Sequence, residues 1–205
     1  MLRRRTPGKE RVIRTLLNHP DGTLTKYKVA KASECPWAST HRILKGLEKA
    51  GLIRDTRVLR FKDLVMVWNG WKAGYDVREY LVREPLKVFR RATASGGLQY
   101  ALTTYQAENL VQNYLFPSRI DFYIEPEEKQ KWHSMLVKEE EALVGKGNVR
   151  LVVAHDKHVF YNSQIIEGLR IVSIPQLIVD LFREGGVCVE AADNLLEKVA
   201  TENLV

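Results

Sequence analysis

Residues 39–53 have the sequence STHRILKGLEKAGLI, and this stretch decides the fold of the first half of the chain. Its large apolar residues, Ile43, Leu44 and Leu47, recur at helical spacing, which predicts an amphipathic helix. Gly51 fits the position just after that helix, where a positive φ is often needed. We therefore expect a helix with one apolar inner face and one polar outer face.

Two shorter helical segments precede this helix. The first, 9–17, places apolar residues on one side and basic residues on the other. Turn-forming residues at 19–22 end it, and Thr25 is suited to cap a second short helix. Pro36 is then suited to the first turn of the third helix. Two helices, a turn and a further helix in this order predict a helix-turn-helix.

An apolar, strand-prone segment follows the third helix. Residues 52–56 and 58–68 are rich in Val, Ile, Leu, Phe and Trp, so we predict short strands here, with a turn at 62–63. A hairpin directly after the third helix is a wing. We therefore predict that residues 1–70 form a winged helix-turn-helix domain.

The stretch 39–53 resembles the winged-helix transcription regulators, in which it is the recognition helix running into the wing. The resemblance implies that the N-terminal part of this helix meets base edges in the major groove of DNA. Arg42 is the best candidate base reader, because a guanidinium can bond to O6 and N7 of guanine together. Lys45 and Lys49 are expected on phosphates. The candidate DNA-binding residues are Trp37, Ser39, His41, Arg42, Lys45 and Lys49 on the helix and Arg57, Arg60 and Lys62 on the predicted wing.

These residues also have plainer interpretations. Basic side chains often only solvate a helix face, and a small winged helix can bind another protein instead of nucleic acid. Trp37 suits packing as well as DNA contact. The run Arg3-Arg4-Arg5 is either a basic arm that reaches DNA or an unstructured terminus.

Charge is divided unevenly along the chain. Residues 1–91 contain 22 Lys and Arg against 9 Asp and Glu, a net of +13. Residues 92–205 contain 10 Lys and Arg against 16 Asp and Glu, a net of −6. The basic excess therefore coincides with the predicted winged helix-turn-helix, where DNA phosphates would lie. The acidic half is not expected to bind DNA strongly, because like charges repel phosphate.

The glycines at 70 and 74 mark the end of the first domain. We predict a junction over 71–97, with a short helix at 76–83 and a strand at 85–93. An acidic α/β domain over 98–205 follows, and it mixes short strands with helices. Its strands are expected at 119–125, 149–154, 159–161 and 169–173, and its last two helices at 176–183 and 190–200. The chain as a whole is predicted to be α+β, a mixed α/β protein.

Three stretches of the second half resemble the C-terminal region of the AbiEi antitoxin-type regulators of type IV toxin–antitoxin systems. They are 100–103 (YALT), 119–124 (RIDFYI) and 168–181 (GLRIVSIPQLIVDL), the last followed by Gly185-Gly186. Together with the winged helix-turn-helix, the resemblance covers most of the chain. It implies a repressor of the antitoxin type, with a possible functional link to a nucleotidyltransferase-type toxin.

The sequence contains no phosphate-binding GxxxxGK[ST] loop, no GxSxG elbow and no HExxH motif. His155 and His158 are spaced poorly for a shared metal. Asp121 with 127–129 faintly resembles a nuclease pattern, but the stretch is too short to arrange carboxylates around one metal. Asp180 is interpreted as a structural carboxylate that bonds backbone or an arginine. We therefore predict a protein that is not an enzyme, with no catalytic residues, no metal and no cofactor.

Cys35 and Cys188 are too few for a disulfide framework, which predicts reduced thiols and a cytoplasmic protein. No apolar run approaches the ~20 residues needed to span a bilayer, so no membrane partner is expected. The expected partner is double-stranded DNA, bound by a homodimer. The predicted function is a sequence-specific transcriptional regulator, a repressor. The alternatives are a small-molecule-sensing winged-helix regulator and a nucleic-acid-processing enzyme that docks through its winged helix.

Overall fold

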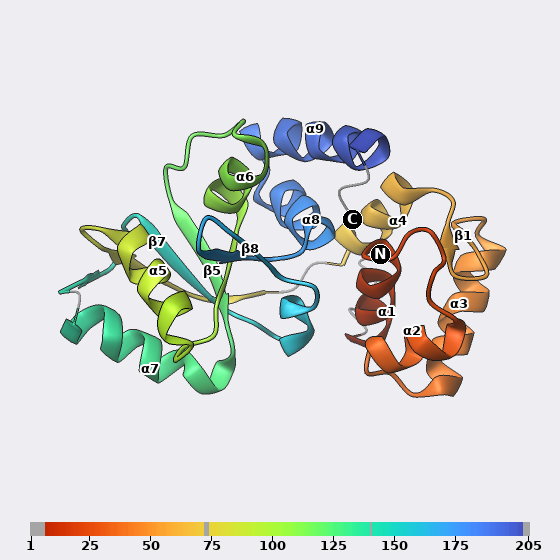
Figure 1. Ribbon diagram of the computed structural model, residues 1–205, viewed down its shortest axis with the longest axis horizontal. Coiled ribbons are helices and arrows are strands. Elements are labelled where there is room, and N and C mark those ends of the chain that lie inside the picture. The colour runs from red at the N-terminus through yellow and green to blue at the C-terminus, as the bar shows by residue number, and fades with distance from the viewer. Residues whose placement is uncertain (1–6, 72–73, 140, 203–205) are drawn as a thin grey trace. The chain divides into compact units, whose positions relative to one another are not determined.

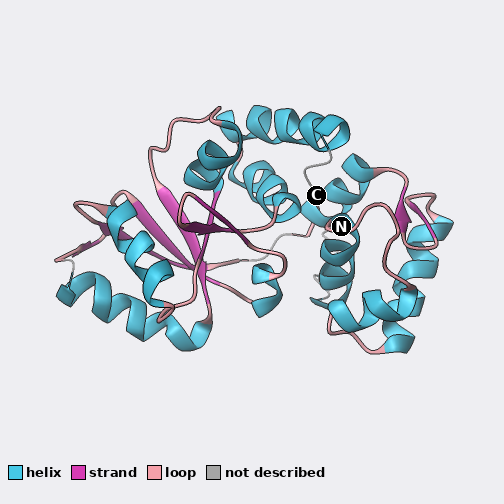
Figure 2. Cartoon of the chain, viewed as in Figure 1, coloured by secondary structure: helices cyan, strands magenta, loops and turns pink. Residues whose placement is uncertain are grey.

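The computed structural model describes residues 7–71, 74–139 and 141–202, and it is a mixed α/β structure (Figures 1 and 2). The expected fold class is therefore confirmed. The chain forms two compact units. The first unit consists of Met1–Ala73, Ile174–Arg183 and Ala192–Val205, and the second consists of Gly74–Ser173 and Glu184–Ala191.

The first unit begins with the predicted helix-turn-helix. Its helices are α1 (Pro7–Leu17), α2 (Lys26–Ala32) and α3 (Trp37–Lys49). Thr25 caps α2 as predicted, because its hydroxyl accepts a hydrogen bond from the backbone N–H of Lys28 at 3.3 Å. Gly51 lies just beyond α3 with a φ of +66°, also as predicted.

The wing is shorter than the sequence predicts. Strand β1 (Ile53–Arg54) pairs antiparallel with β2 (Arg57–Val58), so the hairpin ends at Val58. The predicted strand over 58–68 is wrong, because Phe61–Asn69 form helix α4. Leu64, Val65 and Trp68 are its buried residues, and this spacing places them on one face of a helix.

The last two helices complete the first unit. Helix α8 (Ile174–Glu184) and helix α9 (Val187–Glu202) each cross the boundary between the units, so 174–183 and 192–202 belong with the N-terminal helices. The structure therefore divides the chain differently from the predicted ranges 1–70, 71–97 and 98–205.

The reason is a buried polar network in the first unit. Arg14 of α1 is 2% exposed, and its Nε and Nη2 donate to Oε1 of Gln176 in α8 at 3.0 and 2.8 Å. Its guanidinium lies 4.8 Å from the ring centroid of Trp68. Arg183 of α8 donates to the backbone oxygens of Trp68 and Trp71 at 3.3 and 3.1 Å. These partners are up to 162 positions apart in sequence, so no local sequence pattern predicts that they interact.

The second unit is built on a mixed sheet. In the described residues its seven strands have the order β6-β3-β7-β5-β4-β9-β8. They are β3 (Asp76–Leu81), β4 (Ala101–Thr103), β5 (Ile120–Ile124), β6 (Leu143–Val144), β7 (Val149–Val153), β8 (Gln164–Ile166) and β9 (Leu169–Ile171). The β5–β7 and β4–β9 pairs are parallel, and the other neighbours are antiparallel.

Helices of the second unit pack on this sheet through aromatic residues. They are α5 (Pro85–Ser95), α6 (Thr104–Gln112) and α7 (Lys129–Ser134), with short helical turns at Pro126–Glu128, Met135–Glu139 and Lys157–Phe160. The ring of Phe89 from α5 lies 4.8 Å from that of Phe122 in β5, and Phe122 lies 4.9 Å from Trp132 of α7. All three side chains are fully buried, so this cluster joins α5 and α7 to the sheet.

Three predicted elements of this unit are wrong. Residues 76–83 are not a helix, because 76–81 form strand β3 between β6 and β7. Residues 85–93 are not a strand, because Val88, Phe89 and Ala92 are buried on one face of α5. Residues 159–161 are not a strand, because 157–160 form a helical turn whose last three residues are all buried.

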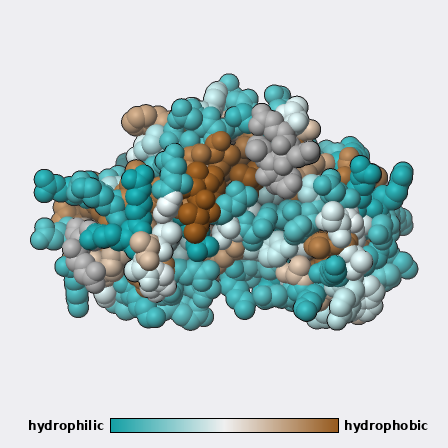
Figure 3. All heavy atoms as spheres, in the orientation of Figure 1, coloured by the Kyte–Doolittle hydropathy of each residue, from teal (hydrophilic) through white to brown (hydrophobic). Residues whose placement is uncertain are grey.

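The face of the molecule visible in Figure 3 is mostly hydrophilic, with hydrophobic area in the region of edge strand β8. In that strand the side chain of Ile165 is 55% exposed. Among the residues that the structure describes, no helix is both long and apolar enough to cross a lipid bilayer.

Candidate nucleic-acid interface

Helix α3 has one buried face and one exposed basic face. Thr40, Leu44 and Leu47 are buried against the rest of the first unit. Arg42, Lys45 and Lys49 are exposed, and their spacing of three and four residues places them on one stripe of the helix. The structure thus brings three of the predicted contacts together on one surface.

Seven basic side chains on α2, α3 and the wing have no partner in the described part of the chain. They are Lys28, Lys31, Arg42, Lys45, Lys49, Arg54 and Arg57, and all are exposed. Nearby cations are paired, since Lys26 Nζ lies 3.1 Å from Asp55 Oδ1 and Arg11 Nη1 lies 3.2 Å from Glu34 Oε2. The seven charges are therefore available to an anion from outside. The predicted arm at 3–5 lies outside the described residues.

The wing places two like charges opposite each other. Arg54 and Arg57 are direct partners across the β1–β2 hairpin. Such a pair destabilises an isolated hairpin, but it concentrates positive charge at the turn. The sequence prediction omits Arg54, because it places the hairpin turn at 62–63 instead of between these two arginines.

Arg60 and Lys62 do not lie on the wing, which corrects the prediction. Arg60 precedes the first turn of α4, and its Nε lies 2.5 Å from Asp63 Oδ2. Lys62 lies in α4, and its Nζ donates to Asp193 Oδ1 of α9 at 2.7 Å. This hydrogen bond raises the pKa of Lys62. Both side chains are thus bound within the first unit, whereas Arg57 is on the wing as predicted.

The aromatic residues at the start of α3 pack on one another. The Trp37 ring lies 6.5 Å from Tyr27 of α2 and 5.7 Å from His41, and Trp37 is still 49% exposed. His41 is half-buried, and its Nδ1 is a buried atom without a hydrogen-bond partner in the described residues. Ser39 is also half-buried. Trp37 is exposed, as are Arg42, Lys45 and Lys49, whereas Ser39 and His41 are less accessible.

Gly46 lies on the same stripe, four residues after Arg42 and three before Lys49. A Cβ atom added at Gly46 meets nothing within 4 Å, so the packing of α3 does not require glycine here. Glycine in a helix interior costs about 1 kcal/mol relative to alanine. Because Gly46 has no side chain, another molecule can approach the backbone of α3 between Arg42, Lys45 and Lys49.

The carboxylate of Asp121 is fully buried in the second unit and bound to two guanidiniums. Arg119 Nε donates to Asp121 Oδ1 at 2.6 Å, and Arg150 Nη2 donates to Oδ2 at 2.8 Å. The same two arginines reach Glu184 at 2.7 and 2.6 Å. The hydroxyl of Thr104 also donates to Asp121. We call Arg119, Asp121, Arg150 and Glu184 the Asp121 cluster; its carboxylates are occupied by protein cations.

The cluster shifts the titration of its members and neighbours. Burial raises the pKa of Glu184, but hydrogen bonds from Arg150 and Arg119 outweigh burial, and the net pKa is lowered. For Arg119, burial alone would lower the pKa, but the hydrogen bond to Asp121 outweighs burial, and the net pKa is raised. Burial, together with a hydrogen bond to Cys188, raises the pKa of Tyr105 to about 12.

Asp180 is a buried structural carboxylate, in line with its sequence interpretation. Its Oδ1 accepts from Gln176 Nε2 at 2.8 Å and lies 4.0 Å from Arg183 Nη1. The nucleic-acid-processing alternative depends on Asp121 or Asp180, and protein groups bind both side chains.

The two histidines of 155–158 lie in different surroundings. His155 is exposed and stacks on Tyr75 at 5.4 Å, whereas His158 is buried and stacks on Tyr161 at 4.7 Å. Within the described residues, no group of three His, Cys, Asp or Glu side chains is arranged to hold a metal ion. Cys35 and Cys188 do not form a disulfide.

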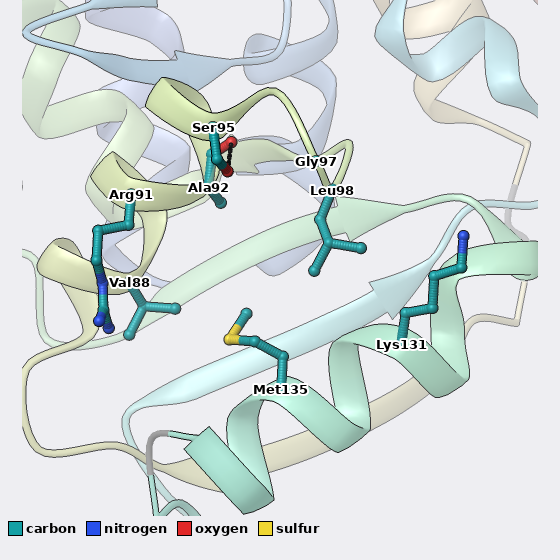
Figure 4. Close-up of a pocket in the computed structure, with 8 residues that line it drawn as sticks. All are labelled: Val88, Arg91, Ala92, Ser95, Gly97, Leu98, Lys131 and Met135. Carbon is teal, nitrogen blue, oxygen red and sulfur yellow. Dashed lines mark hydrogen bonds between the residues drawn. The ribbon is translucent and has the colours of Figure 1, made fainter.

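A cavity with a volume of about 380 Å³ lies between α5 and α7 in the second unit. Figure 4 shows Val88, Leu98 and Met135 around its centre, with Arg91 and Lys131 at opposite ends. The hydroxyl of Ser95 donates to the backbone oxygen of Ala92 at 3.3 Å. The cavity is therefore largely apolar, and its cations do not converge on one point.

Comparisons of the chain with family models, curated proteins and solved structures found no match. The resemblance to AbiEi-type antitoxin regulators therefore stays a prediction from the sequence.

Proposed function

We propose that the protein is a cytoplasmic, sequence-specific DNA-binding transcriptional regulator that acts as a repressor. The observation that carries the proposal is the stripe of Arg42, Lys45 and Lys49 on α3, exposed and without acidic partners in the described residues. In a helix-turn-helix the last helix enters the major groove, and α3 presents this stripe on the face away from its buried side.

Arg42 is proposed to read bases. It lies in the first half of α3, the part of a recognition helix that meets base edges. A bidentate bond from its guanidinium to guanine discriminates against other bases. Lys45 and Lys49 lie further along the stripe and are proposed to bind phosphates, which fixes the register of the helix on DNA.

The wing and α2 are proposed to extend this contact along the DNA backbone. Arg54 and Arg57 concentrate positive charge at the hairpin, and phosphate binding would relieve their mutual repulsion. Lys28 and Lys31 add two exposed charges on α2. Each phosphate that is neutralised releases counterions, so affinity should fall steeply with salt.

The finer parts of the proposal rest on sequence resemblance. Action as an antitoxin-type repressor, and a link to a nucleotidyltransferase-type toxin, are supported by the stretches 100–103, 119–124 and 168–181. A homodimer on a two-fold operator is the usual arrangement for helix-turn-helix proteins. Co-purification with the product of a neighbouring gene, and sedimentation of the protein with and without operator DNA, test these two points.

The central test is the effect of Arg42→Ala on binding to the DNA upstream of the protein's own gene. Fluorescence anisotropy across a salt series would compare this DNA with a scrambled duplex. We expect Arg42→Ala to weaken specific binding by about 1–3 kcal/mol and to remove the preference for the upstream sequence. The free energy of unfolding should change by no more than about 0.5 kcal/mol, because the Arg42 side chain is exposed and has no hydrogen-bond or ion-pair partner in the described residues.

Arg90→Ala is the matched control, because Arg90 is an exposed arginine on α5 without a partner in the described residues. It should leave DNA binding unchanged. Lys45→Ala should weaken binding to both duplexes equally and reduce the salt slope by about one. If wild-type protein binds neither duplex even at low salt, the proposal is wrong, and the stripe on α3 is then a surface for another protein.

A further inference from the structure

A second cavity of the second unit collects hydrogen-bond donors that have no acceptor. Its volume is about 410 Å³, and it lies at the N-terminus of α5, beside α6 and the start of β5. Four groups on its lining make no hydrogen bond in the described part of the chain. They are the backbone N–H of Leu86, the side-chain amide of Gln106, the hydroxyl of Ser118 and Nη1 of Arg119.

The first donor belongs to an uncapped helix end. Helix α5 has 11 residues and begins with Pro85, and the side chain of Glu84 makes no capping hydrogen bond. The N–H of Lys87 is bonded to the backbone oxygen of Glu84 at 3.1 Å, which leaves the N–H of Leu86 unused. The positive end of the helix dipole therefore faces this site, and such ends favour anions.

Gln106 gives independent evidence that the site is built for a ligand. It is only 5% exposed, and its amide has no partner among the described residues. The amide atoms of Gln106 are not among the fully buried side-chain atoms that lack a partner, so they remain open to the cavity. Gln106 lines this cavity, so a ligand there would supply the missing partner.

Arg119 is held in place for binding by the Asp121 cluster. Its Nε and Nη2 are bound to Asp121 and Glu184 at 2.6 and 2.7 Å, which fixes one edge of the guanidinium. Its Nη1 has no hydrogen-bond partner in the described residues, and Arg119 is one of the residues that line the cavity. Lys87 also lines the cavity and pairs with Glu84 at 2.7 Å. Two cations and one carboxylate on the lining leave a formal charge of +1.

We propose that this cavity binds the phosphate group of a small phosphorylated ligand. A phosphate presents several acceptor oxygens in a tetrahedral arrangement, which suits four donors from different directions. A carboxylate has two oxygens and would satisfy fewer of them. Pro117 and Ile120 add apolar surface for the body of the ligand, and the volume lies in the range of small-molecule sites. The proposal is independent of DNA binding by the first unit.

The test is NMR titration of the full-length protein with phenyl phosphate, inorganic phosphate and benzoate at constant ionic strength. We expect saturable shifts of the Leu86 backbone amide and of the Gln106 side-chain amide with both phosphates, and tighter binding of phenyl phosphate. Benzoate should bind more weakly than phenyl phosphate. Absence of saturable shifts at Leu86 with either phosphate, at millimolar concentrations, would overturn the proposal.

Gln106→Glu replaces a donor with a negative charge of the same shape, and we expect phenyl phosphate to bind roughly tenfold more weakly or worse. Gln130→Glu is the matched control, because Gln130 is exposed on α7 outside the cavity, and it should bind as wild type does. Ser118→Ala changes an exposed residue and serves if Gln106→Glu does not fold; it should weaken binding several-fold. Wild-type affinity in both Gln106→Glu and Ser118→Ala would also overturn the proposal.

Discussion

The stripe on α3 and the Asp121 cluster use arginine in opposite ways. On α3, Arg42 is exposed and has no partner in the described residues. In the Asp121 cluster the side chains of Arg119 and Arg150 are only 23% and 22% exposed, and two carboxylates bind them. The first arrangement leaves charge available to an outside anion, and the second uses it to hold Glu184 against strands β5 and β7 within the second unit. On α3 the whole guanidinium of Arg42 is open to an outside anion, whereas in the Asp121 cluster only Nη1 of Arg119 has no hydrogen-bond partner in the described residues.

The largest expected effect is a loss of stability when the buried Asp121 cluster is broken. Asp121→Ala removes the fully buried one of the two carboxylates that Arg119 and Arg150 share and leaves Glu184. We therefore expect the free energy of unfolding to fall by about 3 kcal/mol, the low end for a broken buried ion pair. Urea denaturation followed by circular dichroism measures it. Asp63→Ala removes an exposed partner of Arg60, so it should cost less than about 1 kcal/mol. Equal losses in the two variants would contradict a structural role for the buried cluster.

Gly46→Ala tests whether DNA approaches the exposed stripe on α3. Alanine should raise the free energy of unfolding by about 1 kcal/mol, because glycine is the poorer helix former and the added Cβ meets nothing. The same methyl group lies at the centre of the proposed DNA contact, so we expect weaker binding from a more stable protein. Thermal unfolding and anisotropy, measured on one preparation, give both quantities. Unchanged affinity would show that DNA does not approach the helix at this point.

The smallest expected effect is a pH dependence of the Asp121 cluster. The pKa of Glu184 is lowered from its ordinary value of 4.5 by hydrogen bonds from the two arginines. A lowered carboxyl pKa stabilises the fold above pH 4.5, and that contribution is lost as the pH falls through the lower, folded-state value. The stability difference between wild type and Glu184→Gln should therefore shrink below pH 4.5. A difference that stays constant to pH 3 would mean that the arginines do not favour the charged form.

Local patterns predicted the helix-turn-helix well. The spacing of apolar residues predicted helix α3, the hydroxyl of Thr25 predicted where α2 begins, and Gly51 predicted where α3 ends. These features depend on residues within one or two turns of each other. Four of the predicted DNA contacts, Arg42, Lys45, Lys49 and Arg57, are exposed and have no partner in the described chain.

The wrong predictions have two physical causes. In 58–68 a composition rich in β-prone residues indicates a strand, and in 85–93 an alternating pattern does, but in both segments the buried residues follow the spacing of a helix. Long-range contacts were the second cause. The partner of Lys62 is Asp193, and that of Arg14 is Gln176, so sequence neighbours do not show which cations are occupied. The Asp121 cluster likewise joins residues from 119 to 184.

The return of α8 and α9 to the first unit also affects the order of events during synthesis. The helix-turn-helix leaves the ribosome before α8 does, and Arg14 has no Gln176 to bind until more than 100 further residues are made. At ordinary elongation rates this delay is roughly 5–20 s, during which a buried arginine lacks two of its hydrogen bonds. The unit that carries α3 is therefore completed only after α8 and α9 have been made. A nascent chain or a fragment that ends before α8 would present the basic stripe on an incomplete scaffold.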